Sequence, residues 1–235
     1  TRGQLMSMEP VLSPIVWTTI ATGKLSEKHG IHGFTISDPR TKALIPISST
    51  NRKTSAFWNI YTAHQWTVGV VGWLASWPAE KVNGFNCSNY TYPPFFKTDI
   101  DPIHDQNLHT TYPDSVREEM GKFIVAPDKL SDRVFQRNKL MALSGEYYKR
   151  YIFSRDWAYR QSGLSLLDKY KPNVFAIYFD GVDVLSHVNF PMYKWYRWVK
   201  YNEPTQIYVV PGAPLYSKFS PTPLSKNNLP AYTPE

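Results

Sequence analysis

The segment T-V-G-V-V-G-W, residues Thr67 to Trp73, is short, rich in β-branched residues and almost wholly apolar. Such a run predicts a strand of a parallel sheet with both faces covered. A second run of this kind, N-V-F-A-I-Y-F, spans Asn173 to Phe179 and follows a long region of helical composition, residues 126–170. Strand, crossover helix and strand together predict an α/β fold, an open and mostly parallel sheet with helices on both faces.

One amphipathic helix is predicted just before the first of these strands. Within residues 55–65, side chains recur at i, i+3, i+4 and i+7, namely at Phe57, Ile60, Tyr61 and His64. This is helical spacing, and we expect His64 to be partly buried at the end of the apolar face. Residues 35–51 are polar and contain two prolines, which favours a loop.

The predicted organisation is one α/β domain, residues 1–200, followed by a tail at residues 201–235. Within the domain, residues 74–125 form an irregular loop or cap, which is aromatic and proline-rich and includes a short helix at 113–123. Long segments without periodicity are often functional lids. The tail carries seven prolines and almost no helical period, which predicts an extended segment that is either loose or draped over a protein partner.

Composition excludes several classes of protein. The chain has 235 residues and a net charge of +7, which favours an anionic partner, but its basic residues form no dense run and no dedicated nucleic-acid module is expected. The single cysteine, Cys87, excludes an internal disulfide and a multi-cysteine zinc site. Neither a membrane span nor a signal peptide is evident, so we expect a soluble or peripheral protein of undetermined compartment.

Ser13 is the first candidate functional residue. Ser13 and Pro14 precede eight residues without a helix breaker, and the run ends at Gly23. Serine is a favoured N-cap, proline suits the first helical position and glycine suits the residue past the end. At this N-cap the helix dipole would favour a bound anion or an alkoxide. Ser13 is therefore either a cap alone or a nucleophile toward phosphate.

A second candidate lies directly after the second strand, in D-G-V-D-V-L-S-H, Asp180 to His187. Asp183 and His187 are four residues apart, so a helical turn would place a carboxylate and an imidazole on one face, within reach of one cation. Ligand sites in open α/β sheets lie beyond the carboxyl ends of the strands. The sequence therefore predicts a metal-binding pair at the same edge of the sheet as Ser13.

These segments resemble a known family. Y-F-D-G-V-D-V-L-S-H, Tyr178 to His187, is similar to the Y-x-E-x-P-D-x-x-G-H segment of the nucleotide pyrophosphatase/phosphodiesterases of the alkaline phosphatase superfamily. L-S-P-I-V-W-T-T-I-A-T-G-K, Leu12 to Lys24, with H-G-I after it, resembles their nucleophile helix, T-F-P-N-x-Y-T-x-x-T-G. W-x-x-x-W-P-A-E-x-V-N-G, Trp73 to Gly84, is similar to a bacterial branch of the family. The resemblance covers roughly residues 9 to 195.

The resemblance implies an alkaline-phosphatase-like fold that hydrolyses phosphate esters with two divalent ions, usually zinc. A threonine or serine at the helix N-terminus attacks phosphorus and bridges the ions. Carried over residue by residue, Ser13 takes the position of the nucleophile and metal ligand, and Asp183 and His187 are two ligands of one ion. The implied cofactor is zinc, with manganese as the alternative, at two sites if other ligands are supplied and at none if they are not.

This chain also departs from the family pattern. The family's remaining ligands are an N-terminal aspartate, an Asp-His pair in an S-D-H-G segment and a later histidine. The sequence contains no Asp-His dipeptide, and His187 is its last histidine. Val16 replaces the asparagine that holds a phosphoryl oxygen, and Ser186 replaces the glycine before the ligand histidine. The resemblance therefore implies that the fold and the metal site are incomplete in this chain.

Three functions remain open at this point. The chain is a metal-dependent phosphodiesterase, a phosphoric ester hydrolase whose other ligands lie outside it. Alternatively, it is a catalytically inactive relative that serves as a structural or accessory subunit of a larger complex, held through its aromatic loops and proline-rich tail. A third alternative is the phosphomutase or sulfatase chemistry of the same superfamily.

Overall fold

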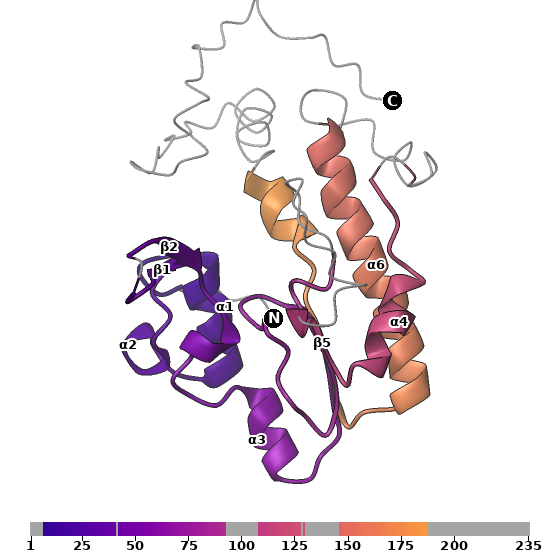
Figure 1. Ribbon diagram of the computed structural model, residues 1–235, viewed down its shortest axis with the longest axis horizontal. Coiled ribbons are helices and arrows are strands. Elements are labelled where there is room, and N and C mark those ends of the chain that lie inside the picture. The colour runs from indigo at the N-terminus through magenta and orange to yellow at the C-terminus, as the bar shows by residue number, and fades with distance from the viewer. Residues whose placement is uncertain (1–6, 41, 93–107, 128, 130–145, 188–235) are drawn as a thin grey trace, which may run out of the picture. The chain divides into compact units, whose positions relative to one another are not determined.

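The computed structural model describes residues 7–40, 42–92, 108–127, 129 and 146–187 (Figure 1). The predicted tail at 201–235 lies outside these residues, so its extended form and its role in partner contacts stay predictions. In the part of the chain that is described, no helix is both long and apolar enough to cross a bilayer.

A four-stranded sheet lies at the centre, in the order β5-β4-β3-β6. Its strands are β3 (Val68–Trp73), β4 (Gly84–Ser88), β5 (Thr111–Tyr112) and β6 (Val174–Ile177). β3 pairs in parallel with both β4 and β6, and β5 pairs antiparallel with β4. The sheet is open and mostly parallel, which confirms the fold class expected from the two apolar runs.

Helices cover both faces of the sheet (Figure 1). Val68 and Val70 of β3 pack in one cluster with residues of α1 (Ser13–Thr22) and α3 (Phe57–Ala63). Val71, on the opposite face, packs with residues of α4 (Ser115–Gly121) and α6 (Glu146–Tyr170). The alternation follows from the two-residue period of a strand, and it explains why β3 has no polar face.

The two predicted strands differ in burial. All six residues of β3 are buried, as the apolar run predicts. The residues of β6 are only half-buried, although its sequence suggested full burial. The reason lies in the order of the strands: β3 has a partner on each side, whereas β6 is the outermost strand of the described sheet on its side.

Gly72 creates a bulge near the end of β3. It adopts φ +70, and the pairing with β4 shifts between Val71 and Trp73. A Cβ on Gly72 would lie 2.4 Å from the Tyr159 ring of α6. A bulge inserts one extra residue and so reverses the face of the next side chain. Trp73 consequently packs on the side of α1 and α3, opposite Val71.

Residues 74–125, predicted to be an irregular cap, contain two strands of the central sheet. β4 was not predicted because its apolar side chains, Phe85 and Cys87, are only two, and they alternate with the polar Asn86 and Ser88. Asparagine, glycine and serine have low strand propensity, yet both polar residues are fully buried. The short helix expected at 113–123 is present as α4.

Two local predictions are corrected by the structure. Residues 35–51, expected to be a loop, contain an antiparallel hairpin of β1 (Thr35–Ser37) and β2 (Leu44–Pro46) and the 3-10 turn η1 (Ser49–Asn51). All three residues of each strand are exposed, so neither strand has a buried face of alternating apolar residues. α3 forms as expected, but it buries Trp58 and leaves Ile60 and His64 exposed. The Trp58 ring packs in the cluster with β3 and takes the buried position that the helical spacing assigned to Ile60 and His64.

We expect Gly72→Ala to destabilise the fold by about 2–4 kcal/mol, because the added methyl group meets the Tyr159 ring and alanine is strained at positive φ. Gly33→Ala is the matched control, since a Cβ there has no neighbour within 4 Å. Urea unfolding of both variants and the wild type measures the effect. Equal midpoints for the two variants would contradict this account of the bulge.

Candidate functional site

Ser13 begins α1 as its first helical residue, not as its N-cap. Leu12 is the cap, with extended φ −116 and ψ 130, and its carbonyl accepts the N–H groups of Ile15 and Val16. The predicted N-cap role of Ser13 is therefore wrong, while Gly23 ends the helix at φ 63 as predicted. Because its hydroxyl makes no capping bond, Ser13 is available for a contact across the molecule.

Trp17 determines how α1 lies against the sheet. It stands one helical turn after Ser13, on the same face of the helix. Its ring packs edge-on against Tyr178, with 4.6 Å between ring centroids, and against Trp73, with 5.4 Å. Trp73 also donates its indole N–H to the Trp17 carbonyl at 3.3 Å. Since Trp73 and Tyr178 lie at the carboxyl ends of neighbouring parallel strands, the start of α1 is held at this edge of the sheet.

The three predicted site residues come together at this edge. Residues 181–187 are helical, so Asp183 and His187 share one face, with 3.4 Å between Asp183 Oδ1 and His187 Nε2. Ser13 Oγ lies 3.4 Å from Asp183 Oδ2 and donates a long hydrogen bond to it. The side chains of His187 and Asp183 are 62% and 41% exposed. The site is thus open to solvent, and the roles of the three residues stay predictions.

Sequence reasoning missed the residues that hold helix 181–187 in place. Asp156 of α6 accepts hydrogen bonds from the backbone N–H groups of Asp180 and Gly181, at 3.1 and 2.9 Å. Asp180 forms an ion pair with Arg155 and accepts the Tyr178 hydroxyl at 2.8 Å. The only signal in the sequence was the run of acidic and basic residues on a long helix, which does not reveal a partner 24 or 25 residues away.

Burial raises the pKa of two of these groups. It raises the pKa of Asp156 to about 6, although the Gly181 N–H opposes the shift. It also raises the pKa of Tyr178 to about 12, with a further contribution from Asp183. The Tyr178 hydroxyl is therefore protonated at neutral pH, which suits its role as the donor to Asp180.

His29, in the H-G-I segment, belongs to the scaffold of α1. It is fully buried in α2 (Ser26–His29), and its Nδ1 accepts the Ile31 N–H at 3.1 Å. The hydrogen is therefore on Nε2, which donates to Thr19 Oγ1 at 3.0 Å. Both ring nitrogens are thereby engaged, so His29 is a packing residue and not a metal ligand in this arrangement.

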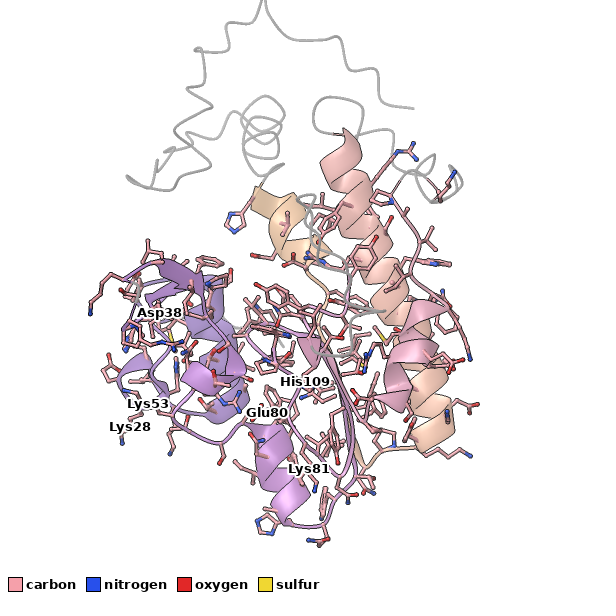
Figure 2. The ribbon with its side chains drawn as sticks, viewed as in Figure 1. Lys28, Asp38, Lys53, Glu80, Lys81 and His109 are labelled. Carbon is pink, nitrogen blue, oxygen red and sulfur yellow. The ribbon has the colours of Figure 1, made fainter. Side chains whose placement is uncertain are left out.

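Glu80, in the W-P-A-E segment, also has a scaffold role. Its carboxylate accepts bonds from Arg52 at 2.7 and 2.8 Å, from the Trp58 indole at 2.8 Å and from Asn59 at 3.1 Å. Figure 2 labels Glu80 near α3, which supplies two of these donors. Its oxygens are thus occupied in linking residues around η1 and α3, and Glu80 is not a candidate ligand.

The sequence model of the type I phosphodiesterase / nucleotide pyrophosphatase family matches residues 1–194. The chain belongs to this family. It is part of the alkaline phosphatase superfamily, and membership supports a phosphoesterase-like function with a phosphate ester as substrate. No curated protein and no solved structure gives a significant match.

Members of this family typically depend on metal, so the donor atoms can be tested for a metal site. The described residues contain no group of three or more His, Cys, Asp or Glu side chains placed to hold an ion. Ser13, Asp183 and His187 supply one hydroxyl, one carboxylate and one imidazole. Zinc bonds of 2.0–2.1 Å in a tetrahedron imply neighbouring donors about 3.4 Å apart, which is the length of both separations, although one involves Oδ2 of Asp183 and the other Oδ1. These donors fit part of the shell of one ion, but not two ions.

We expect His29 to make the protein less stable in mild acid. Burial, with a contribution from His32, lowers the pKa of His29 below its usual 6.5. The unfolded chain therefore binds a proton more readily, and stability falls as the pH drops below about 6.5. Thermal unfolding at pH 7.5 and 5.5 measures this slope, which should become shallower in His29→Gln and stay unchanged in His64→Gln, an exposed control. Equal slopes in all three proteins would contradict it.

Proposed function

We propose that this protein is a metal-dependent phosphodiesterase-like hydrolase in which Ser13 is the nucleophile. The observation that carries the proposal is the convergence of Ser13 with Asp183 and His187, although Ser13 and Asp183 are 170 residues apart in the sequence. Family membership supports the phosphoester class of substrate. The metal and the identity of the ester belong to the proposal.

Ser13 has the right surroundings for attack on phosphorus. It stands at the first position of a ten-residue helix, where unpaired backbone N–H groups and the helix dipole favour the phosphate of a substrate and the alkoxide of the serine. Asp183 Oδ2 accepts the hydrogen bond of the Ser13 hydroxyl and is therefore placed to take its proton. Attack by Ser13 Oγ forms an O–P bond and breaks the bond to the leaving group, which takes up a proton from water and departs as the alcohol. The serine then carries the remaining phosphate ester, and water displaces it to give the phosphate monoester and restore the Ser13 hydroxyl.

Asp183 and His187, with Ser13, are the residues that would hold one divalent ion. When bound, such an ion supplies charge stabilisation to the phosphoryl oxygens and lowers the pKa of the nucleophile. Asp183 orients the hydroxyl, and the exposed flank of His187 leaves room for the ester to approach. A second ion would need donors other than these three.

The alternative is a catalytically inactive relative that serves as a structural or accessory subunit. The observation that favours it is the donor set itself, since the described residues contain no group of three or more His, Cys, Asp or Glu side chains placed to hold an ion. Under this hypothesis the aromatic loops and the proline-rich tail hold the chain in a larger complex. Metal content separates the two: zinc or manganese near one ion per chain supports the hydrolase, and metal-free, inert protein supports the accessory subunit.

We expect Ser13→Ala to lower the hydrolysis of bis-p-nitrophenyl phosphate by at least about 100-fold, because the nucleophile is removed while the fold is retained. Ser115→Ala is the matched control, since Ser115 is also the first residue of a helix, α4, but is exposed. The assay is run on the full chain with added Zn²⁺, and release of nitrophenolate is followed.

Other outcomes would revise the proposal. Equal rates in Ser13→Ala and wild type would eliminate Ser13 as the nucleophile. Faster turnover of a nitrophenyl sulfate than of the phosphodiester would favour the sulfatase chemistry of the superfamily. Intramolecular transfer of phosphate within a sugar phosphate would favour a mutase.

A further inference from the structure

We propose that Asp156 of α6 is a positioning residue for the site: its carboxylate caps the helix that carries Asp183 and His187 and thereby sets where their side chains lie. The inference rests on the proposed function only in treating Asp183 and His187 as metal ligands. The capping contact itself is a property of the described fold.

The contact uses both oxygens of Asp156. Oδ1 accepts the Asp180 N–H at 3.1 Å, and Oδ2 accepts the Gly181 N–H at 2.9 Å. The first N–H groups of a helix have no partner within the helix, and a carboxylate is a favourable acceptor for them. Here the acceptor comes from another helix and not from the preceding residue, so the cap also joins two elements.

Close approach makes this contact specific. A Cβ added to Gly181 would lie 2.4 Å from Asp156 Oδ2 and 3.4 Å from the Ile152 side chain. A side chain at position 181 would therefore have to displace the Asp156 carboxylate from its present position. Gly181 stands two residues before Asp183, so a shift of this backbone moves the first proposed ligand directly.

A second contact, made by the Asp180 side chain, also holds the start of helix 181–187. Asp180 forms an ion pair with Arg155, the neighbour of Asp156 on α6, and accepts the Tyr178 hydroxyl at 2.8 Å. The segment 180–181 is thus tied to α6 through its backbone and through a side chain. α6 is itself anchored to the sheet by the fully buried Tyr159 and Leu166, so it provides a rigid support.

Electrostatics argue that Asp156 does more than stabilise the fold. Burial raises its pKa from 3.8 to about 6, against the opposing effects of the Gly181 N–H and of Arg155. The native state therefore binds the proton more tightly than the unfolded chain, and this group alone lowers stability as the pH rises from about 4 to 6. An ionised Asp156 at neutral pH is costly for folding, whereas it is the best acceptor for two N–H groups.

The test is Asp156→Asn in the full chain, with Asp168→Asn as the matched control, an exposed aspartate on the same helix. Asparagine keeps the shape but offers one acceptor in place of two. Hydrogen–deuterium exchange should become about 10-fold faster at residues 180–187 and stay unchanged in β3. The affinity for Zn²⁺ alone, measured by titration calorimetry, should fall about 10- to 100-fold, the range for groups that orient metal ligands. Asp168→Asn should change neither.

Gly181→Ala is the second variant, because it disrupts the same contact without altering Asp156. Local acceleration of exchange in both variants supports the inference even if the wild type binds no Zn²⁺, a result that would overturn only the proposed function. Unchanged exchange at 180–187 would overturn the inference. Exchange that becomes equally faster in β3 and α6 would also overturn it, because Asp156 would then stabilise the whole fold and not helix 181–187 in particular.

Discussion

The complete burial of β3 is the constraint on which the rest of this structure depends. A strand covered on both faces and paired on both sides must be supplied with two layers of helices and two neighbouring strands. The chain provides α1 and α3 on one face and α4 and α6 on the other. The parallel pairing of β3 with β4 and β6 then places three strand ends at one edge. The candidate site lies at that edge.

The position of the site follows from this arrangement through one aromatic contact. The bulge at Gly72 turns Trp73 toward α1, and Tyr178 follows the neighbouring strand β6. Trp17 packs against both rings, which holds the start of α1 against the sheet. Ser13, one turn earlier on the same face, is thereby brought to the helix that begins just after Tyr178. This aromatic contact brings Ser13 to the edge, while the bonds that Asp156 accepts hold the helix that carries Asp183 and His187.

Local patterns were sufficient to predict part of this structure. The apolar runs of β3 and β6, the Pro-Gly punctuation of α1 and the four-residue spacing of Asp183 and His187 are each contained in a few neighbouring residues. β4 was missed because its polar residues are buried against other segments, and the β1–β2 hairpin was missed because it has no buried face. Ser13 was misplaced by one position, since Leu12 can cap through its backbone alone. Asp156 could not be predicted, because its partners follow a separate strand.

The charged residues that support the site are more buried than the candidate reactive residues. Asp156 and Asp180 are partly buried at a cost in desolvation, and their carboxylates accept hydrogen bonds from backbone N–H groups, from Arg155 and from the Tyr178 hydroxyl. Asp183 and His187 remain exposed and contact each other and Ser13. Among the described residues, the donor atoms thus approach from two helix ends and leave their outer side to solvent. Under the proposed function, a phosphate ester or an ion would approach from that exposed side, while the cap on helix 181–187 keeps Asp183 and His187 in position.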